Sequence, residues 1–526
     1  MNCLLKSFLV GLAGIQGLSL VAETRPKLVV GIMVDQLRTD YIENLREMLS
    51  DGGFRRLMDQ GIYFTDVDFQ VPGGDAASAS AIIQTGSFPK INGIGGSSVF
   101  DPNTNSLKSV FQDEAYIGNF TSETYSPAAL RVTTLTDEIA IENQGKSLIH
   151  SIAPDAAQAL VLSGHSGNSA FWINDETGRW SSTTYYSNLP NILQNKNYSG
   201  PLISRLDTMI WVPLRKEPYP YVSSDNSKRG FRYTFSRSDK EVFDLYKSSP
   251  FVNADITDAA IDYLKDLRLG NHNDVTDVLN LGYSLAVYPN YNNENYRFEL
   301  EDAYLRLDRD LERLFTSLDK QVGKDNVLVY LFSTGYFNEP AIDNPNYRLP
   351  GGTFSVKRAL SLLNAYLSAK YGNGAYVNHY ADHHIFLSKS LLEEKNLDIR
   401  TIAEESRDFL IRMSGVADVF TLADLISPSG SHLDGMRRAI DPKTAGDIIL
   451  DFNAGWKVVD DSRFPPITYD NKTTAYNTPG FIMGAGIKPK EVIETIEAVS
   501  IAPTLAGKLR IRSPNSADSK PLSILK

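Results

Sequence analysis

Four segments of the chain are continuous apolar runs rather than alternations of apolar and polar positions. They span residues 27–34, 277–281, 326–332 and 446–452. Runs of this kind are typical of strands that are buried on both faces of a parallel sheet. Because long stretches of sequence separate them, the sheet must carry large insertions. The pattern predicts an α/β fold with a mostly parallel central sheet and helices on both of its faces.

A helical period follows the second of these runs. Leucine or tyrosine recurs at intervals of three and four residues from Leu300 to Leu318, and charged residues fill many of the positions between them. This spacing predicts an amphipathic helix that lies on the sheet. Strand, helix and strand over about 277–333 would then form one βαβ unit.

Two segments differ in composition from the predicted core. Residues 168–240 are rich in Tyr, Trp, Ser, Asn and Pro, and we expect an irregular cap inserted over the carboxyl edge of the sheet. Residues 340–420 form a second expected insertion, which contains a helical stretch from Lys357 to Tyr371. The domain prediction is therefore one α/β domain over residues 25–526 that carries these two insertions.

The first residues have the composition of a secretory signal, predicted over residues 1–22. Lys6 precedes an apolar stretch, and the small residues Ser19 and Ala22 suit cleavage. An uncleaved membrane anchor is the alternative interpretation of these first residues. No later segment of the sequence is apolar enough to span a bilayer. We expect a periplasmic, secreted or cell-surface protein without a transmembrane segment in its mature chain.

Cysteine usage and charge exclude several kinds of site. The one cysteine, Cys3, lies in the predicted signal, so the mature chain would have no disulfide and no thiolate chemistry. The formal net charge is −11, and removal of Lys6 with the signal lowers it to −12. This balance disfavours nucleic acid and anionic membrane surfaces as partners.

Five motifs occur in order along nearly the whole mature chain: KLVVGIMVDQLRTDY, GDAASASAIIQTGSFPKINGIGG, SGHSGNSAFWINDETGRWSSTTYY, EDAYLRLDRDLERLF and VSIAPTLAGKLRI. Together they resemble the alkaline phosphatase superfamily, in the branch of monomeric periplasmic phosphatases that is also similar to type I phosphodiesterases and nucleotide pyrophosphatases. The resemblance implies an alkaline-phosphatase-like sandwich with two zinc ions, bound by Asp and His at the carboxyl ends of core strands. It also implies a Ser or Thr nucleophile at the start of a helix. Two dications close together need anionic oxygens and neutral imidazoles around them.

The first zinc ligand that the resemblance implies is retained as Asp35, at the end of the first strand. A lone carboxylate there could also cap the following helix. In the elbow over residues 74–86, the nucleophile position falls on Ala76, whose methyl group can neither attack phosphorus nor bind zinc. Ser78 and Ser80 lie roughly 200° and 400° further around the helix axis. A displaced serine nucleophile is therefore the alternative to the absence of any nucleophile.

The remaining ligands that the resemblance implies fall on residues that cannot replace them. The second Asp and His pair falls on Val287 and Tyr291, and the third pair falls on Ser333 and Thr334. The last histidine falls at about Asn477.

The residues expected to hold the substrate phosphate are also changed. They fall on Asp155 and Ala157, and an acid at that place would repel a phosphate. The sequence Asp382-His383-His384 is a possible metal fragment, but neighbouring residues of a strand point to opposite faces, so a structural role is favoured.

These changes favour a catalytically degenerate member of the superfamily: a secreted binding or assembly protein with no catalytic residue and no intact metal site. No cofactor is predicted, an anionic ligand is disfavoured, and the expected partner is a protein or glycan of the cell envelope. The predicted binding cleft consists of Asp35, Asp75, Ser78, Ser333, Thr334 and Asn477.

Two other functions stay open. One is a zinc-dependent phosphomonoesterase or phosphodiesterase with a rearranged site near Asp35, Asp75 and Ser78. The other is a carbohydrate- or peptide-binding surface, because aromatic faces stack on sugars, although the same rings could form the core of the cap. The aromatic cap residues are Phe171, Trp172, Trp180, Tyr185 and Tyr186.

Overall fold

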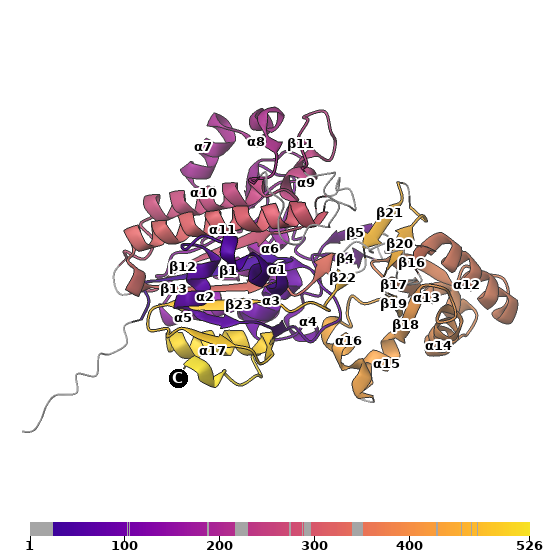
Figure 1. The fold of residues 1–526 in the computed structure, drawn as a ribbon. Helices are drawn as coiled ribbons and strands as arrows, with labels where there is room; N and C mark the ends of the chain where they lie inside the picture. Colours follow the sequence, from indigo (N-terminus) through magenta and orange to yellow (C-terminus); the bar gives the residue numbers. More distant parts are fainter. Residues whose placement is uncertain are drawn as a thin grey trace, which may run out of the picture.

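A ten-stranded sheet forms the centre of the molecule in this computed structural model (Figure 1). The structure describes residues 25–525 apart from 102–103, 105, 187–188, 216–229, 273–274, 287, 289–295, 339–350, 428–429, 454, 464 and 471. Across the sheet the strands follow the order β24 (Lys490–Val492), β2 (Ile62–Phe64), β23 (Gly480–Gly484), β13 (Val327–Ser333), β1 (Leu28–Asp35), β12 (Asp277–Ser284), β7 (Ile149–Ile152), β8 (Ser169–Ile173), β9 (Trp180–Thr183) and β6 (Gly118–Asn119).

The middle of this sheet is parallel. β1 pairs in parallel with β12 and β13, and the parallel part continues through β7 to β8. Antiparallel pairs flank it, where β23 joins β13 and β9 joins β8. The register places Asp35 beside Ser284 and Val34 beside Ser333, so the carboxyl ends of three strands meet at one edge. The predicted α/β fold and three of its four predicted core strands are confirmed.

Helices cover both faces of the sheet. Alternate residues of β1 point to opposite sides, so both faces present apolar side chains that a helix layer can bury. Val30, Ile32 and Val34 pack in one layer, and Val29 and Met33 pack in the other. The first layer includes α1 (Thr39–Leu45), α2 (Phe54–Gln60), α10 (Phe251–Asp266) and α11 (Tyr296–Gln321). The second layer includes α3 (Ala76–Thr85), α5 (Leu135–Glu142) and α17 (Ile501–Leu509). Figure 1 shows α10 and α11 above the sheet and α5 and α17 below it.

The helix predicted from Leu300 to Leu318 is α11, which extends over 26 residues. Leu307, Leu311 and Leu314 are fully buried, in agreement with the predicted apolar stripe. The helix lies beside α10 on one face of the sheet (Figure 1). β12, α11 and β13 therefore form the predicted βαβ unit.

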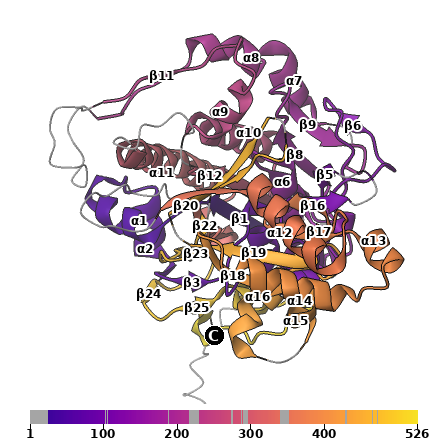
Figure 2. The same cartoon turned by 90° about the vertical axis from the view of Figure 1, so that its right-hand side faces the viewer.

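The chain between β13 and β23 builds a lobe beside the central sheet, with a hydrophobic core of its own (Figures 1 and 2). One sheet of the lobe has the order β15 (Gly352–Ser355), β20 (Trp456–Asp460) and β21 (Ile467–Asp470). The other has the order β16 (Val377–Ala381), β17 (His384–Leu387), β19 (Ile448–Phe452) and β18 (Val416–Thr421). The helices of the lobe include α12 (Val356–Tyr371), α13 (Lys389–Glu394), α14 (Ile399–Leu410), α15 (Leu422–Ile426) and α16 (Asp434–Ala439).

The assignment of residues 446–452 to the central parallel sheet is wrong. This run forms β19, which pairs antiparallel with β17 and β18 of the lobe. Ile448 and Leu450 are buried in the core of the lobe. An apolar run indicates that a strand is buried, but it carries no information on which strand lies beside it.

The segment 168–240 begins inside the central sheet, because β8 and β9 are its first elements. The elements that follow are α7 (Asn191–Ser199), α8 (Leu202–Arg205), β10 (Ile210–Trp211) and β11 (Tyr233–Thr234). The predicted signal, residues 1–22, lies outside the described residues. Within the described part of the chain, every helix is too short or too polar to span a bilayer.

Candidate functional site

Asp35 lies at the carboxyl edge of the sheet and is hydrogen-bonded to its neighbours. The Thr334 hydroxyl donates to Asp35 Oδ1 at 2.8 Å, and the Gln36 side-chain amide donates to Asp35 Oδ2 at 3.4 Å. The backbone N–H of Gln36 donates to the Thr334 hydroxyl at 3.2 Å, and Gln36 has a positive φ of 61°. The structure therefore brings two of the predicted cleft residues, Asp35 and Thr334, into direct contact.

Ser333 ends β13 and is fully buried together with Thr334. Its hydroxyl accepts a hydrogen bond from the backbone N–H of Gly335 at 3.4 Å. Gly335 itself has a φ of 74°, and an added Cβ would lie 2.4 Å from the ring of Phe69. The strand end is thus held in a tight turn that leaves no room for a larger side chain at residue 335.

The elbow before α3 is closed by a capping box. Asp75 Oδ1 accepts from the backbone N–H of Ser78 at 2.9 Å, and Ser78 Oγ accepts from the backbone N–H of Asp75 at 2.9 Å. Asp75 Oδ2 also accepts from the N–H of Ser97 at 2.6 Å. Ala76 is the first helical residue. Ser78 and Ser80 are both buried, so neither hydroxyl is presented to a substrate as the displaced nucleophile would require.

Tyr336 connects the end of β13 to the elbow, a contact that no sequence pattern predicted. An added Cβ on Gly74 would lie 2.5 Å from the Tyr336 ring, and the ring packs against Phe69 with centroids 5.8 Å apart. The side chain is buried, and its hydroxyl has no hydrogen-bond partner among the described residues. Burial raises the pKa of the Tyr336 phenol, so it stays protonated.

Asn477 lies near the start of α1. Its backbone carbonyl accepts from the N–H of Thr39 at 3.0 Å, and its side chain is exposed. The preceding ring, Tyr476, lies under the Arg38 guanidinium at 3.4 Å, and Arg38 also pairs with Asp40. Among the described residues, no hydrogen bond joins Asn477 to the other predicted cleft residues.

Asp155, at a position expected to hold phosphate, is paired with a cation. Lys247 Nζ lies 2.8 Å from Asp155 and 2.5 Å from Asp175. Asp155 immediately precedes α6 (Ala156–Ser163), and Lys247 ends α9 (Val242–Lys247). The predicted repulsion of a phosphate is therefore reduced, because the negative charge of Asp155 is shared with Lys247.

All seven histidines of the chain lie among the described residues, and none is bonded to the cleft residues named above. His150 shares a hydrogen bond with Ser169, and burial lowers its pKa to about 4. The other histidines with a defined neighbour are His165, which bonds Asp137 and the Leu130 carbonyl, His272 beside Asp277, His379 beside Arg463, His383 against Phe452 and His384, which accepts from the N–H of Gly446.

The Asp382-His383-His384 fragment is part of the lobe. Asp382 and His383 both have positive φ values, and they form the turn between β16 and β17. Burial lowers the pKa of His384 to about 4, so this imidazole is neutral and its Nδ1 is used by a backbone amide. These contacts support the structural role that the sequence favoured.

The aromatic cap residues are core rather than surface. Phe171, Trp172, Trp180 and Tyr186 are buried. Tyr185 is half-buried, and its hydroxyl donates to the backbone carbonyl of His165 at 2.8 Å. These rings do not present an exposed face on which a sugar could stack.

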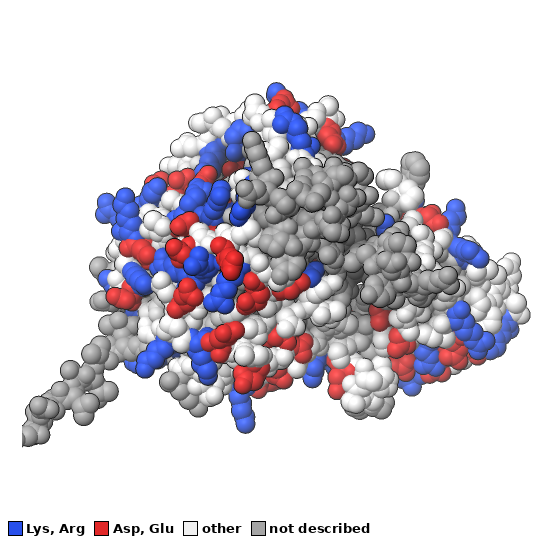
Figure 3. Space-filling model, in the orientation of Figure 1, with Lys and Arg blue, Asp and Glu red and all other residues white. Residues whose placement is uncertain are grey.

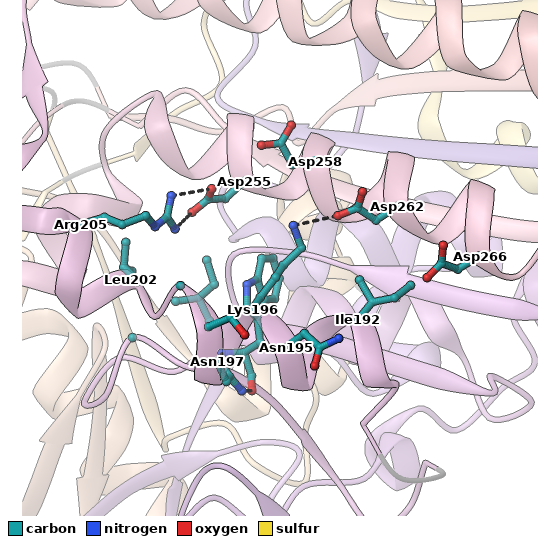
Figure 4. Close-up of a pocket in the computed structure, with 15 residues that line it drawn as sticks. Ile192, Asn195, Lys196, Asn197, Leu202, Arg205, Asp255, Asp258, Asp262 and Asp266 are labelled. Carbon is teal, nitrogen blue, oxygen red and sulfur yellow. Dashed lines mark hydrogen bonds and ion pairs between the residues drawn. The ribbon is translucent and has the colours of Figure 1, made fainter.

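A pocket of about 560 Å³ opens between α7, α8 and α10 (Figure 4). Its α10 side carries a row of carboxylates, and the facing cations pair with them: Arg205 with Asp255 and Lys196 with Asp262. Figure 3 shows acidic and basic side chains interspersed over this face of the molecule. Ion pairs join Arg313 of α11 to Asp258 of α10 and Arg306 to Asp302 within α11. The pocket shares no residue with the predicted cleft around Asp35.

Comparison with known proteins places the chain in a family. The family described as type I phosphodiesterase / nucleotide pyrophosphatase matches residues 29–481. The chain belongs to this family. The matched range of this phosphodiesterase-family protein runs from β1 to β23, so it includes Asp35, the elbow and the end of β13.

Named relatives match over almost the whole length. Alkaline phosphatase PafA of Elizabethkingia meningoseptica is 29% identical, and the alignment covers 98% of both chains. Alkaline phosphatase PhoV of Synechococcus elongatus is 26% identical over 95% of this chain and 93% of its own. The crystal structure of wild-type PafA superimposes with a TM-score of 0.81 at 26% identity, over 95% of this chain and 99% of that chain. The predicted alkaline-phosphatase-like fold is confirmed.

These relatives overturn the prediction of a non-catalytic binding or assembly protein. PafA and PhoV are alkaline phosphatases, and they align with this phosphodiesterase-family protein from end to end rather than over a shared fragment. The comparison favours the alternative of a phosphoric ester hydrolase. The prediction failed because an inventory of replaced motif residues shows which side chains are absent, but it does not show what the whole chain does.

The residues described here do not fit the zinc pair that the resemblance implies. They contain no group of three or more His, Cys, Asp or Glu side chains placed to hold a metal. Ser333 and Thr334 occupy the expected positions of the third ligand pair, at the end of β13, and Ala76 occupies the expected nucleophile position at the elbow. Val287 and Tyr291, the expected positions of the second Asp and His pair, lie outside the described residues.

Proposed function

We propose that this protein is a phosphoric ester hydrolase that cleaves phosphate monoesters in the cleft beside Asp35. The observation that carries the proposal is the end-to-end match to PafA, which combines 98% coverage of both sequences with a TM-score of 0.81. The cleft lies where the carboxyl ends of β1, β12 and β13 meet, which is the usual place of ligand binding in open α/β sheets.

Asp35 is the side chain of the cleft best placed to act on a proton. It is partly exposed, and it already accepts a hydrogen bond from the buried Thr334 hydroxyl. In the proposed reaction a water oxygen bonds to phosphorus and the proton lost by water goes to the Asp35 carboxylate. The bond from phosphorus to the alcohol oxygen breaks, and the Asp35 carboxylic acid then returns the proton to that oxygen, which leaves as the alcohol. Thr334 and Gln36 orient that carboxylate. Ser78 has no role, because its hydroxyl is used in the capping box.

The test is hydrolysis of an aryl phosphate monoester and an aryl phosphate diester by the purified chain, with and without added zinc. We expect release of the aryl alcohol from the monoester, and we expect Asp35→Ala to lower kcat/KM by about 100-fold or more, as for loss of a general base. Asp408→Ala is the matched control, because Asp408 is an exposed acid on α14 of the lobe.

Thermal unfolding of both variants shows whether they are folded. Turnover no faster than in buffer would contradict the proposal. Equal rates in Asp35→Ala and Asp408→Ala would contradict the placement of the reaction at Asp35. Faster cleavage of the diester than of the monoester would replace the phosphomonoesterase with a phosphodiesterase.

A further inference from the structure

We infer that the Asp35 cleft binds no pair of zinc ions, and that hydrogen bonds from Thr334 and Gln36 take the place of metal at the Asp35 carboxylate. The inference rests on the proposed function only for the location of the site. Three features carry it: the supply of ligands, the side chains at the ligand positions, and the packing of Tyr336.

None of the seven histidines, all of which lie in the described part of the chain, is bonded to a residue of this cleft. Zinc sites in proteins are built from His nitrogen, Cys sulfur and carboxylate oxygen. All seven histidines are placed by the structure, and six of them have a defined neighbour away from Asp35. The seventh, His432, is exposed in the lobe between β18 and β19. The one cysteine, Cys3, belongs to the predicted signal. A zinc pair at Asp35 would therefore need ligands that are almost all carboxylates.

The side chains at the expected ligand positions are neutral and are already used. The Thr334 hydroxyl donates a hydrogen bond to Asp35 Oδ1 at 2.8 Å. The hydroxyl proton therefore lies between Thr334 Oγ1 and Asp35 Oδ1, where a cation bound to these two oxygens would have to lie. Ser333 is fully buried, and its hydroxyl accepts from the Gly335 N–H. Ala76, at the start of α3, has no donor atom in its side chain.

Tyr336 fills the region between the end of β13 and the elbow. Its ring packs close to Gly74 and against the ring of Phe69. The packing therefore places an aromatic ring beside the elbow, where a zinc pair would need imidazole or carboxylate ligands.

The test is the zinc content of the full chain, which is read without any activity assay. The protein is incubated with excess zinc, separated from free metal by gel filtration and measured by elemental analysis, together with Asp35→Asn and the control Asp408→Asn. Asp35→Asn keeps an oxygen that can accept from Thr334 but removes the charge that would hold a cation. We expect all three proteins to retain the same amount of zinc, far below two ions per chain, and to melt at the same temperature with zinc or with a chelator.

Close to two zinc ions per chain in the wild type and in Asp408→Asn, with a clear loss in Asp35→Asn, would overturn the inference. A rise in melting temperature with zinc that is abolished only by Asp35→Asn would also overturn it. Equal retention of some zinc by all three proteins would place that zinc outside the cleft and support the inference. Because hydrolysis is assayed separately, the inference and the proposed function can each fail without the other.

Discussion

Thr334→Val removes the hydroxyl that joins Asp35 to Gln36 but keeps the branched shape of the side chain. Two hydrogen bonds are lost: the 2.8 Å bond to Asp35 Oδ1 and the 3.2 Å bond from the Gln36 amide. A hydrogen bond to a charged group contributes about 1.5–3 kcal/mol, and a buried donor without a partner costs about 1–3 kcal/mol. The added methyl group returns about 0.8 kcal/mol. We therefore expect the free energy of unfolding to fall by about 2–5 kcal/mol.

The assay is urea unfolding followed by tryptophan fluorescence. Three of the four tryptophans lie in the central body, and Trp456 lies in the lobe. In a Trp456→Phe protein, tryptophan fluorescence therefore reports the unfolding of the central body, which contains Thr334. Thr334→Ser is the matched variant, since it keeps the hydroxyl and loses only a methyl group, at about 1 kcal/mol. A double-mutant cycle with Asp35→Ala isolates the pair, and we expect a coupling energy of about 1.5–3 kcal/mol.

Two results would refute this reasoning. One is a Thr334→Val protein within about 0.5 kcal/mol of the wild type. The other is an absence of coupling between Thr334→Val and Asp35→Ala, because the two side chains would then not share the 2.8 Å bond.

Two further predictions concern the surroundings of the cleft. Gly335→Ala should lower the free energy of unfolding by about 1–3 kcal/mol more than Gly145→Ala, because both have positive φ but only residue 335 meets a ring, that of Phe69 at 2.4 Å. Equal urea midpoints for the two variants would contradict this. The hydrogen bond to Asp137 raises the pKa of His165 in the folded state. The protonated imidazole therefore stabilises the folded protein fully below about pH 6.5, and this stabilisation is lost as the pH rises through the folded pKa. Urea midpoints should therefore fall from pH 6.5 upward in the wild type and fall less in His165→Gln; parallel slopes would show that His165 is not the titrating group.

The central sheet could be predicted because its strands are buried on both faces. Residues 27–34 contain no polar side chain after Lys27, and such a run has few alternatives in a soluble α/β protein. α11 could be predicted because its period is long and regular. The partner of each strand could not be predicted, as β19 shows. Short edge strands such as β6 and β24 have two or three residues and give no periodic signal.

The candidate site was predicted in part. Asp35, Ser333 and Thr334 lie at the same edge of the sheet, at the ends of strands that the family motifs define. Gln36 was missed, because its backbone N–H bonds the hydroxyl of Thr334, which is distant in sequence. Tyr336 was missed, because its position depends on packing against the elbow, which is distant in sequence.

The most direct measurement is the rate of aryl phosphate monoester hydrolysis by chelator-treated protein, before and after zinc is added back, in the wild type and in Asp35→Ala. We expect the wild-type rate to be the same before and after zinc, and the rate to be lost in Asp35→Ala. A rate that appears only when zinc is present, or no hydrolysis under either condition, would contradict a hydrolase whose cleft is held together by hydrogen bonds at Asp35.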